Sequence, residues 1–241
     1  MANWYIGCSG FSYRHWKGKF YPADLPQSKW LSFYLQHFNT IEINATFYNF
    51  PQLKTLEKWY QSCSPTFRFS IKAPRGITHY KQFLNAEGLI ADFYTVINDG
   101  LKEKLGPVLF QMPPKFIYSD ERLDRLLDNL NPSFKNVVEL RDESWWRGDV
   151  FDALAKQGIT FCGMSHPKLP DDVIQNTPVV YYRFHGAPEL YRSPYDTAFL
   201  QKIANEIDKN PQTKEAWLYF NNDIDVAAID NAKELMMMAS L

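Results

Sequence analysis

The amino-acid sequence predicts an α/β fold, a TIM (β/α)8 barrel, formed by a single domain over residues 1–241. Eight short apolar runs alternate with segments of helical spacing, at roughly 30 residues per unit. A chain of 241 residues has the size of such a barrel, and no Gly-, Ser- or Pro-rich linker divides it. A doubly wound open sheet is the alternative, but "GCSGF" at 7–11 lacks the glycine spacing of a dinucleotide-binding turn.

The expected strands are rich in Val, Ile, Phe and Tyr, and many are bounded by Gly, Pro, Asn or Asp. They span residues 4–10, 40–48, 68–74, 107–114, 136–142, 160–165, 179–186 and 215–223. Apolar stripes predict helices over 28–38, 120–130 and 197–207. Ser119 is expected to cap the second of these helices, and Asp223 to cap the final helix of the chain.

Composition favours a soluble protein of the cytoplasm. The net charge is −1, so no global basic field attracts the chain to nucleic acid or anionic membrane. Three cysteines are too few and scattered for a disulfide framework, and Cys8 and Cys162 are expected in the core. The N-terminus does not read as a signal peptide, and no apolar run approaches the roughly 18 residues of a membrane helix, so no membrane partner is expected.

Glu42 interrupts an apolar run, between Ile41 and Ile43. Side chains alternate across a strand, so the two isoleucines share one face while Glu42 and Asn44 share the other. In a barrel the isoleucines would face the surrounding helices. Glu42 and Asn44 would then point inward near the carboxyl end of the strand, where the active sites of TIM barrels lie.

The same alternation in six further strands also turns polar residues inward. The predicted mouth contains Ser9, Glu42, Asn44, Lys72, Gln111, Glu139, Arg141, Arg183, His185 and Asn221. Charges are costly to bury unpaired, so their gathering on one face needs a reason. One reason is a structural network, in which Glu42 pairs with Lys72 and Glu139 pairs with Arg141 or Arg183. The other is a ligand site.

Seven motifs resemble the YecE-like family, known as domain of unknown function 72. They are "GCSGFSYRHWKGKFYP", "IEINATFY", "FSIKAP", "LFQMPP", "VELRDESWW", "YYRFHG" and "YFNND", and they occur in family order from residue 4 to residue 223. The resemblance implies a TIM barrel. It implies little about activity, because the family is named for having none assigned.

The favoured chemistry is general acid–base catalysis on a phosphorylated or carboxylated small molecule, without a metal or other cofactor. Lys72, Arg141 and Arg183 would hold the anion, since arginine presents a planar fork to phosphate or carboxylate. Gly186 would allow close approach of the backbone, and Tyr48 could reach the ligand from a loop. Glu42 or Glu139 would be the general base, with His185 as acid or orienting group.

Three alternatives remain open. A metal-dependent hydrolase would use Glu42, Glu139 and His185 as ligands, although the neighbouring cations would repel a metal. A glycoside hydrolase would use the two glutamates, although cations favour the charged form of both. A nucleic-acid binding or processing protein would use the first loop, where Tyr13 and Trp16 alternate with basic residues. The oligomeric state stays open.

Overall fold

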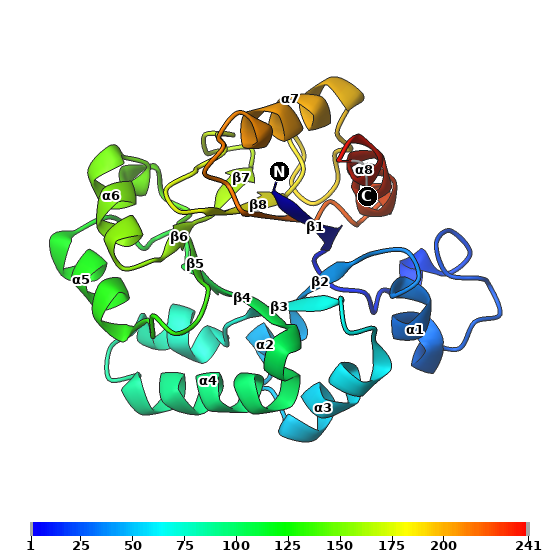
Figure 1. Ribbon diagram of the computed structural model, residues 1–241, viewed down its shortest axis with the longest axis horizontal. Helices are drawn as coiled ribbons and strands as arrows, with labels where there is room; N and C mark the ends of the chain where they lie inside the picture. Colours follow the sequence, from blue (N-terminus) through cyan, green and yellow to red (C-terminus); the bar gives the residue numbers. More distant parts are fainter. Residues whose placement is uncertain (1, 240–241) are drawn as a thin grey trace. The chain divides into compact units, whose positions relative to one another are not determined.

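The computed structural model describes residues 2–239, which form an α/β fold with two parallel sheets (Figure 1). The α/β class is therefore confirmed. The chain divides into two compact units: residues up to Glu42 together with those from Gly163 onward, and residues Ile43–Cys162. The single-domain prediction stays a prediction. Among the described residues, no helix has the length and apolar character needed to cross a bilayer.

The first unit is built from both ends of the chain. Its sheet has the order β1-β9-β8-β7, and all neighbouring strands are parallel. The strands are β1 (Asn3–Cys8), β7 (Gly163–Ser165), β8 (Val179–Phe184) and β9 (Glu215–Phe220), and β2 (Thr40–Ile43) ends at the unit boundary. The helices are η1 (Arg14–Trp16), η2 (Gln27–Lys29), α1 (Trp30–Tyr34), α7 (Thr197–Asp208) and α8 (Ala227–Met238).

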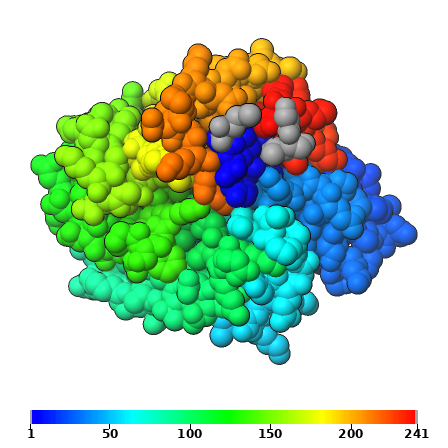
Figure 2. Space-filling view, in the orientation of Figure 1, coloured from blue at the N-terminus to red at the C-terminus, as the bar shows by residue number. Residues whose placement is uncertain are grey.

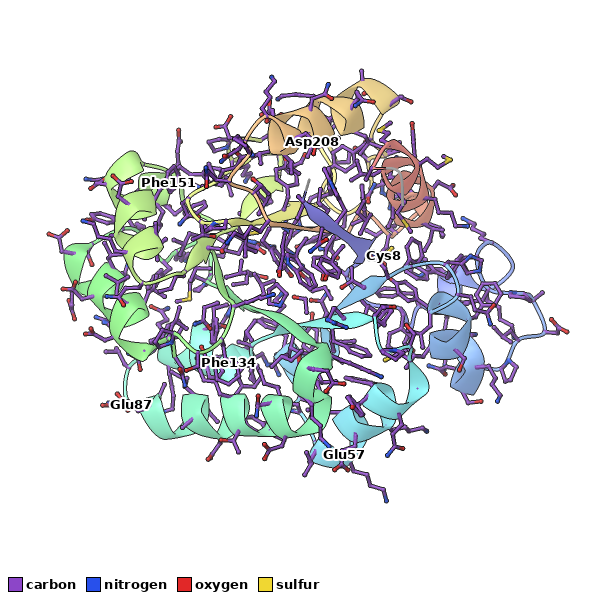
Figure 3. The ribbon with its side chains drawn as sticks, in the orientation of Figure 1. Cys8, Glu57, Glu87, Phe134, Phe151 and Asp208 are labelled. Atoms are coloured by element: carbon purple, nitrogen blue, oxygen red, sulfur yellow. The ribbon has the colours of Figure 1, made fainter. Side chains whose placement is uncertain are left out.

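The strands of the first unit are buried along most of their length and form its core. Leu218 and Phe220 are buried, as is Tyr219 between them, and the ring of Phe220 stacks on Phe184 with centroids 4.1 Å apart. Helix α8 packs against β1 and β9, so the two ends of the chain lie together. Figure 2 shows this on the surface, where dark blue residues of the N-terminus border orange and red residues of the C-terminal part. Cys8, labelled in Figure 3, ends β1 and is buried as expected.

The second unit follows the chain in order. The five-stranded sheet has the order β2-β3-β4-β5-β6, with β3 (Arg68–Lys72), β4 (Leu105–Gln111), β5 (Asn136–Glu139) and β6 (Thr160–Phe161). The helices are α2 (Ala45–Tyr48), α3 (Leu53–Ser62), the π-helix η3 (Gly76–Lys81), α4 (Glu87–Leu101), η4 (Lys102–Lys104), α5 (Asp120–Asn129), η5 (Glu143–Trp145) and α6 (Gly148–Lys156). Helix α4 covers β4 and packs against α3. Phe134, labelled in Figure 3, stacks on Tyr94 of α4 with centroids 4.3 Å apart.

Strand order within the five-stranded sheet follows the sequence without reversal. Neighbouring strands are consecutive in the chain and are joined by segments that contain helices. A doubly wound sheet reverses its order at a switch point, whereas a TIM barrel does not. The observed order is therefore consistent with a TIM-like α/β fold.

Several predictions of elements are wrong in part. The helix expected over 28–38 ends at Tyr34, the last residue of α1. The expected strand over 40–48 ends at Ile43, and Ala45–Tyr48 form a short helix. The expected strand over 160–165 is divided into β6 and β7, which belong to different sheets. Asp223 does not cap the final helix, because α8 follows Val226 and no side chain caps its N-terminus. The Ser119 cap is confirmed, since its side chain accepts a hydrogen bond from the Arg122 amide at 3.3 Å.

Candidate functional site

Polar side chains gather where the strands of the first unit end. Ser9 directly follows β1, Arg183 and His185 lie at the end of β8, and Asn221 follows β9. Backbone hydrogen bonds hold these ends in register: the Ser9 amide donates to the Phe220 carbonyl, and the Asn221 amide donates to the Phe184 carbonyl, both at 2.8 Å. Parallel strands place their carboxyl ends at one edge, so the sequence alternation brings these residues together.

Glu42 is fully buried and accepts three hydrogen bonds within the first unit. Ser9 Oγ donates to Glu42 Oε1 at 2.7 Å, and the Tyr181 hydroxyl donates to Oε2 at 2.6 Å. Arg183 Nη2 donates to Oε1 at 2.7 Å and forms an ion pair with it. We name Ser9, Glu42, Tyr181, Arg183 and His185 the Glu42 cluster. The buried charge of Glu42 is thus matched by a cation and two hydroxyl donors, as burial of a charge requires.

Tyr181 is a member of this cluster that the sequence analysis did not single out. Burial raises the pKa of its phenol well above the usual range, and the charge of Glu42 raises it further. The hydroxyl therefore keeps its proton and serves as a donor. The alternation rule contained the signal, because Tyr181 lies two residues before Arg183 and shares its face.

His185 is fully buried beside Arg183. Its Nδ1 lies 3.1 Å from Asn221 Nδ2, and its Nε2 lies 3.4 Å from Arg183 Nη1. Gly186 follows in the left-handed region with φ of 87°. Its amide donates to the Tyr195 hydroxyl at 2.7 Å, so this N–H already has a partner in the protein. Its predicted role in ligand binding stays a prediction.

The first loop packs its aromatic rings into the first unit. Trp16 is fully buried, with ring centroids 5.0 Å from Tyr13 and 5.7 Å from Phe20. The Tyr13 hydroxyl donates to the Ser9 carbonyl at 2.6 Å, which ties the loop to the Glu42 cluster. Packing of the first loop is one of the two interpretations of its aromatic residues. The predicted role of Tyr13 and Trp16 in ligand binding stays a prediction.

A second group of polar residues lies at the strand ends of the second unit. Lys72 ends β3, Gln111 ends β4 and Glu139 ends β5, and Gln111 lies directly beside Glu139 in the register. Lys72 Nζ donates to Gln111 Oε1 at 2.6 Å, and Arg141 Nε donates to Glu139 Oε1 at 2.5 Å. Lys72, Gln111 and Glu139 are buried, while Arg141 keeps about a tenth of its side chain exposed.

His79 adds a titratable group to this set. Partial burial is the main cause that lowers its pKa to about 4, and the cations Lys72, Arg141 and Arg75 lower it further, against a smaller opposite effect of Glu139. The imidazole is therefore neutral at physiological pH. We name Lys72, Gln111, Glu139, Arg141 and His79 the Lys72 cluster.

Phe47 connects the Lys72 cluster to the surface of the second unit. Lys72 Nζ lies 4.2 Å from the centroid of the Phe47 ring, and His79 meets the same ring edge-on at 4.9 Å. Tyr48, the next residue, is 63% exposed. Asn44 lies just before these residues and is half-buried at the start of α2.

His79 is a candidate site residue that the sequence does not single out. The spacing gave no signal for it, because the residue lies on a π-helix that follows β3 and not on a strand. Chain separation also conceals it, since His79 and Arg141 are brought together only by the fold. The prediction that all ten polar residues share one mouth stays a prediction. Among residues 2–239, no group of three or more His, Cys, Asp or Glu side chains is placed to hold a metal ion.

Comparisons with known proteins agree over nearly the whole chain. UPF0759 protein YunF of Bacillus subtilis is 24% identical over 274 residues, which cover 98% of this chain and 95% of that protein. A crystal structure of a DUF72 family protein from Thermotoga maritima superposes with a TM-score of 0.89 at 28% identity, covering 99% of this chain and 100% of that one. A DUF72 family protein from Enterococcus faecalis V583 gives 0.81 at 19% identity, covering 99% and 96%, which shows the fold alone.

The family of this chain is shown by a match to a protein-family model. "Protein of unknown function DUF72" matches residues 5–241, so the resemblance to domain of unknown function 72 is confirmed, while the YecE-like name rests on the sequence motifs alone. A match of this extent leaves little of the chain outside the family region. The chain belongs to the DUF72 family.

Proposed function

We propose that this protein is an enzyme that binds a phosphorylated or carboxylated small molecule at the Lys72 cluster and acts on it by acid–base chemistry without a metal. The observation that carries the proposal is the set of cations around His79. Lys72, Arg75 and Arg141 all lower its pKa, and Glu139 is the only carboxylate among the main influences on it. The surroundings of this imidazole are thus positive on balance.

A positive, partly buried site favours an anionic ligand. Water screens charges poorly where side chains exclude it, so a phosphate or carboxylate that enters gains more there than at an open surface. Arg141 suits such a ligand because its guanidinium presents a planar fork of donors, of which Nε is directed to Glu139. Gln111 holds Lys72 at 2.6 Å and so fixes the direction of the ammonium group.

Proton transfer at this site would involve Glu139 and His79. The neutral imidazole can accept a proton, and Thr78 Oγ1 lies 2.9 Å from its Nδ1 and orients the ring. A bound anion would offset the nearby cations and raise the pKa of His79 toward its ordinary value. Binding would therefore bring the imidazole closer to the range in which it both takes and returns a proton.

The Glu42 cluster supports a different role for Glu42 and His185. All three donors to Glu42 come from the protein, and Glu42, Arg183 and His185 are buried. Such an arrangement supports a network that fixes the ends of β1, β2 and β8. The catalytic assignment of Glu42 and His185 stays a prediction. We also propose that the chain is one TIM-barrel domain, which the uninterrupted order of β2 to β6 supports.

The test measures thermal stability of the wild type and of Arg141→Met against sugar phosphates, small carboxylic acids and neutral sugars. A ligand at about 100 times its dissociation constant adds about 2.7 kcal/mol, which raises the midpoint by several degrees for a chain of this size. We expect stabilisation by one anionic class and its loss in Arg141→Met. Arg147→Met is the matched control, because Arg147 pairs with Asp149 on the surface of the same unit. Equal responses of both variants would reject the proposal.

A further inference from the structure

Two exposed tyrosines flank an arginine beside the Lys72 cluster. Tyr48 is 63% exposed and Tyr80 is 71% exposed. The guanidinium carbon of Arg75 lies 5.7 Å from the Tyr48 ring centroid and 5.4 Å from the Tyr80 ring centroid. Both distances are within cation–π range. We name Tyr48, Arg75 and Tyr80 the ring patch.

The ring patch is joined to the Lys72 cluster by direct ring contacts. Phe47 meets Tyr48 edge-on at 5.1 Å and His79 at 4.9 Å, and it carries Lys72 over its face at 4.2 Å. Arg75 is also one of the cations that lower the pKa of His79. Exposed aromatic faces and buried cations therefore adjoin each other within the second unit.

The backbone that carries the patch has an uncommon form. Tyr80 and His79 lie on the six-residue π-helix, a conformation that occurs mostly as short pieces and often at functional sites. Gln82, Phe83 and Asn85 follow it with positive φ of 47°, 65° and 48°. Such residues persist where the surrounding structure holds them, and they concentrate at binding sites.

The strained turn is anchored to the core. Phe83 is buried, and its ring lies 5.6 Å from Phe110 of β4. This anchor fixes the end of the π-helix, so Tyr80 is presented from a supported backbone and not from a loose loop. A single exposed tyrosine is ordinary on a protein surface. Two exposed tyrosines on either side of an arginine, held by a supported backbone, indicate a binding surface.

We infer that the ligand of this site is an anion that carries a planar ring, of the class of a nucleoside 5′-phosphate. The ring would stack on Tyr48 or Tyr80 beside Arg75, and the phosphate would meet Lys72 and Arg141. Aromatic side chains stack on any base because every base has a π-face, and arginine adds a cation–π contact. This inference rests on the proposed function and names its substrate class.

The test compares three probes by calorimetry: AMP, ribose 5-phosphate and adenosine. In the wild type we expect AMP to bind at least tenfold more tightly than ribose 5-phosphate, a difference of about 1.4 kcal/mol. In Tyr48→Leu/Tyr80→Leu this preference should fall to about twofold or less, with binding of ribose 5-phosphate unchanged. Tyr118→Leu is the matched control, because Tyr118 also contacts an arginine, Arg147, at 4.5 Å on the same unit. Both tyrosines of the patch are exposed, so the double variant is expected to fold.

The outcomes separate the two proposals. Equal binding of AMP and ribose 5-phosphate, both weakened by Arg141→Met, would reject the planar ring and keep the anion site. Adenosine binding as tightly as AMP, with no effect of Arg141→Met, would reject the anion and with it the proposed function. Absence of AMP binding would also overturn the inference. If Tyr118→Leu loses the preference for AMP as the double variant does, the ring patch is not the source of that preference.

Discussion

Glu42 and Arg183 form an ion pair in the interior of the first unit, with side-chain exposures of 0% and 1%. Removing one partner of a buried pair leaves the other charge uncompensated, which costs about 3–5 kcal/mol. We therefore expect Glu42→Gln and Arg183→Met each to lower the free energy of unfolding by that amount. Urea denaturation of the purified variants measures it.

The double variant Glu42→Gln/Arg183→Met is the control for this pair. It removes both charges together, so we expect its cost to be smaller than the sum of the single costs by at least about 1 kcal/mol. Additive costs would mean that each residue acts through other neighbours. The pair would then not be the main stabilising feature of the Glu42 cluster.

His79 makes stability depend on pH. Its pKa is about 4 in the folded protein against an ordinary 6.5, so between these values the unfolded chain binds more protons than the folded one. The free energy of unfolding should therefore fall as the pH is lowered from 6.5 toward 4, and His79→Gln should reduce this fall. Urea denaturation across this range, with NMR titration of the imidazole, measures both.

Lys72→Met should move the titration of His79 upward, because the variant removes the first of the cations that lower its pKa. Titration of His79 near 6.5 in the wild type would contradict the electropositive site. An unchanged titration in Lys72→Met would mean that Lys72 does not contribute to the low pKa of His79.

At the scale of residues, the sequence predicted part of the site well. Strand alternation brought Ser9, Glu42 and Arg183 to one place, and they do bond to one another. The partner of each charge was harder to predict, because register and side-chain reach decide it. Glu139 pairs with Arg141, one of the partners considered, whereas the influence of the cations on the pKa of His79 depends on a π-helix that no periodicity reveals.

The C-terminal end of helix α3 is bound by a buried lysine, Lys104, which lies on η4. Lys104 Nζ donates to the Tyr60 carbonyl at 2.7 Å and to the Cys63 carbonyl at 2.8 Å, at the C-terminal end of that helix. The last carbonyls of a helix lack partners within it and favour a cation. We expect Lys104→Met to lower the free energy of unfolding by about 2–3 kcal/mol.

The control for this prediction is Lys102→Met, two residues earlier. Lys102 is exposed, and its Nζ lies 5.5 Å from the Tyr60 ring, so its loss should cost less than about 0.5 kcal/mol. Chemical denaturation of both variants measures the two changes in the free energy of unfolding. Similar costs would indicate that the charge of this segment matters and the two hydrogen bonds do not.

Gln82 directly follows the π-helix and has a left-handed backbone with φ of 47° and ψ of 45°. Glycine takes this conformation without the steric cost that a side chain meets. Gln82→Gly should therefore raise the free energy of unfolding by about 1 kcal/mol. Lys81→Gly, one residue earlier and inside the helix, should lower it, and thermal denaturation compares the two. Destabilisation by both changes would contradict the assigned strain.

At the scale of elements, type was easier to predict than length. Apolar alternation located the strands, but "NATFY" looked like more strand because Thr, Phe and Tyr favour strands, and only the fold turns it into α2. Residues 160–165 are divided between two sheets because the boundary between the two units falls between Cys162 and Gly163. The strand propensity of single residues does not predict where such a boundary falls.

The whole chain is predicted to unfold as one domain. Both units would then melt in one transition, with an enthalpy of about 170 kcal/mol for 241 residues at about 0.7 kcal/mol per residue. Scanning calorimetry should give one peak whose van't Hoff and calorimetric enthalpies agree. Two resolved peaks would reject the single domain and assign separate stability to the two compact units.

The pairing of β1 with β9 has a consequence during synthesis. Cys8 lies beside Phe220, so the first strand meets β9 only after 212 further residues (220 − 8) have been made. At ribosomal rates of about 5–20 residues per second, this takes roughly 10 to 40 s. The second unit is continuous in the chain and can assemble during that time. Residues 34–42, which also contact β1, are made early, so only the edge of β1 that pairs with β9 waits for the end of the chain. We therefore expect this edge to stay open to chaperones while residues 43–162 fold.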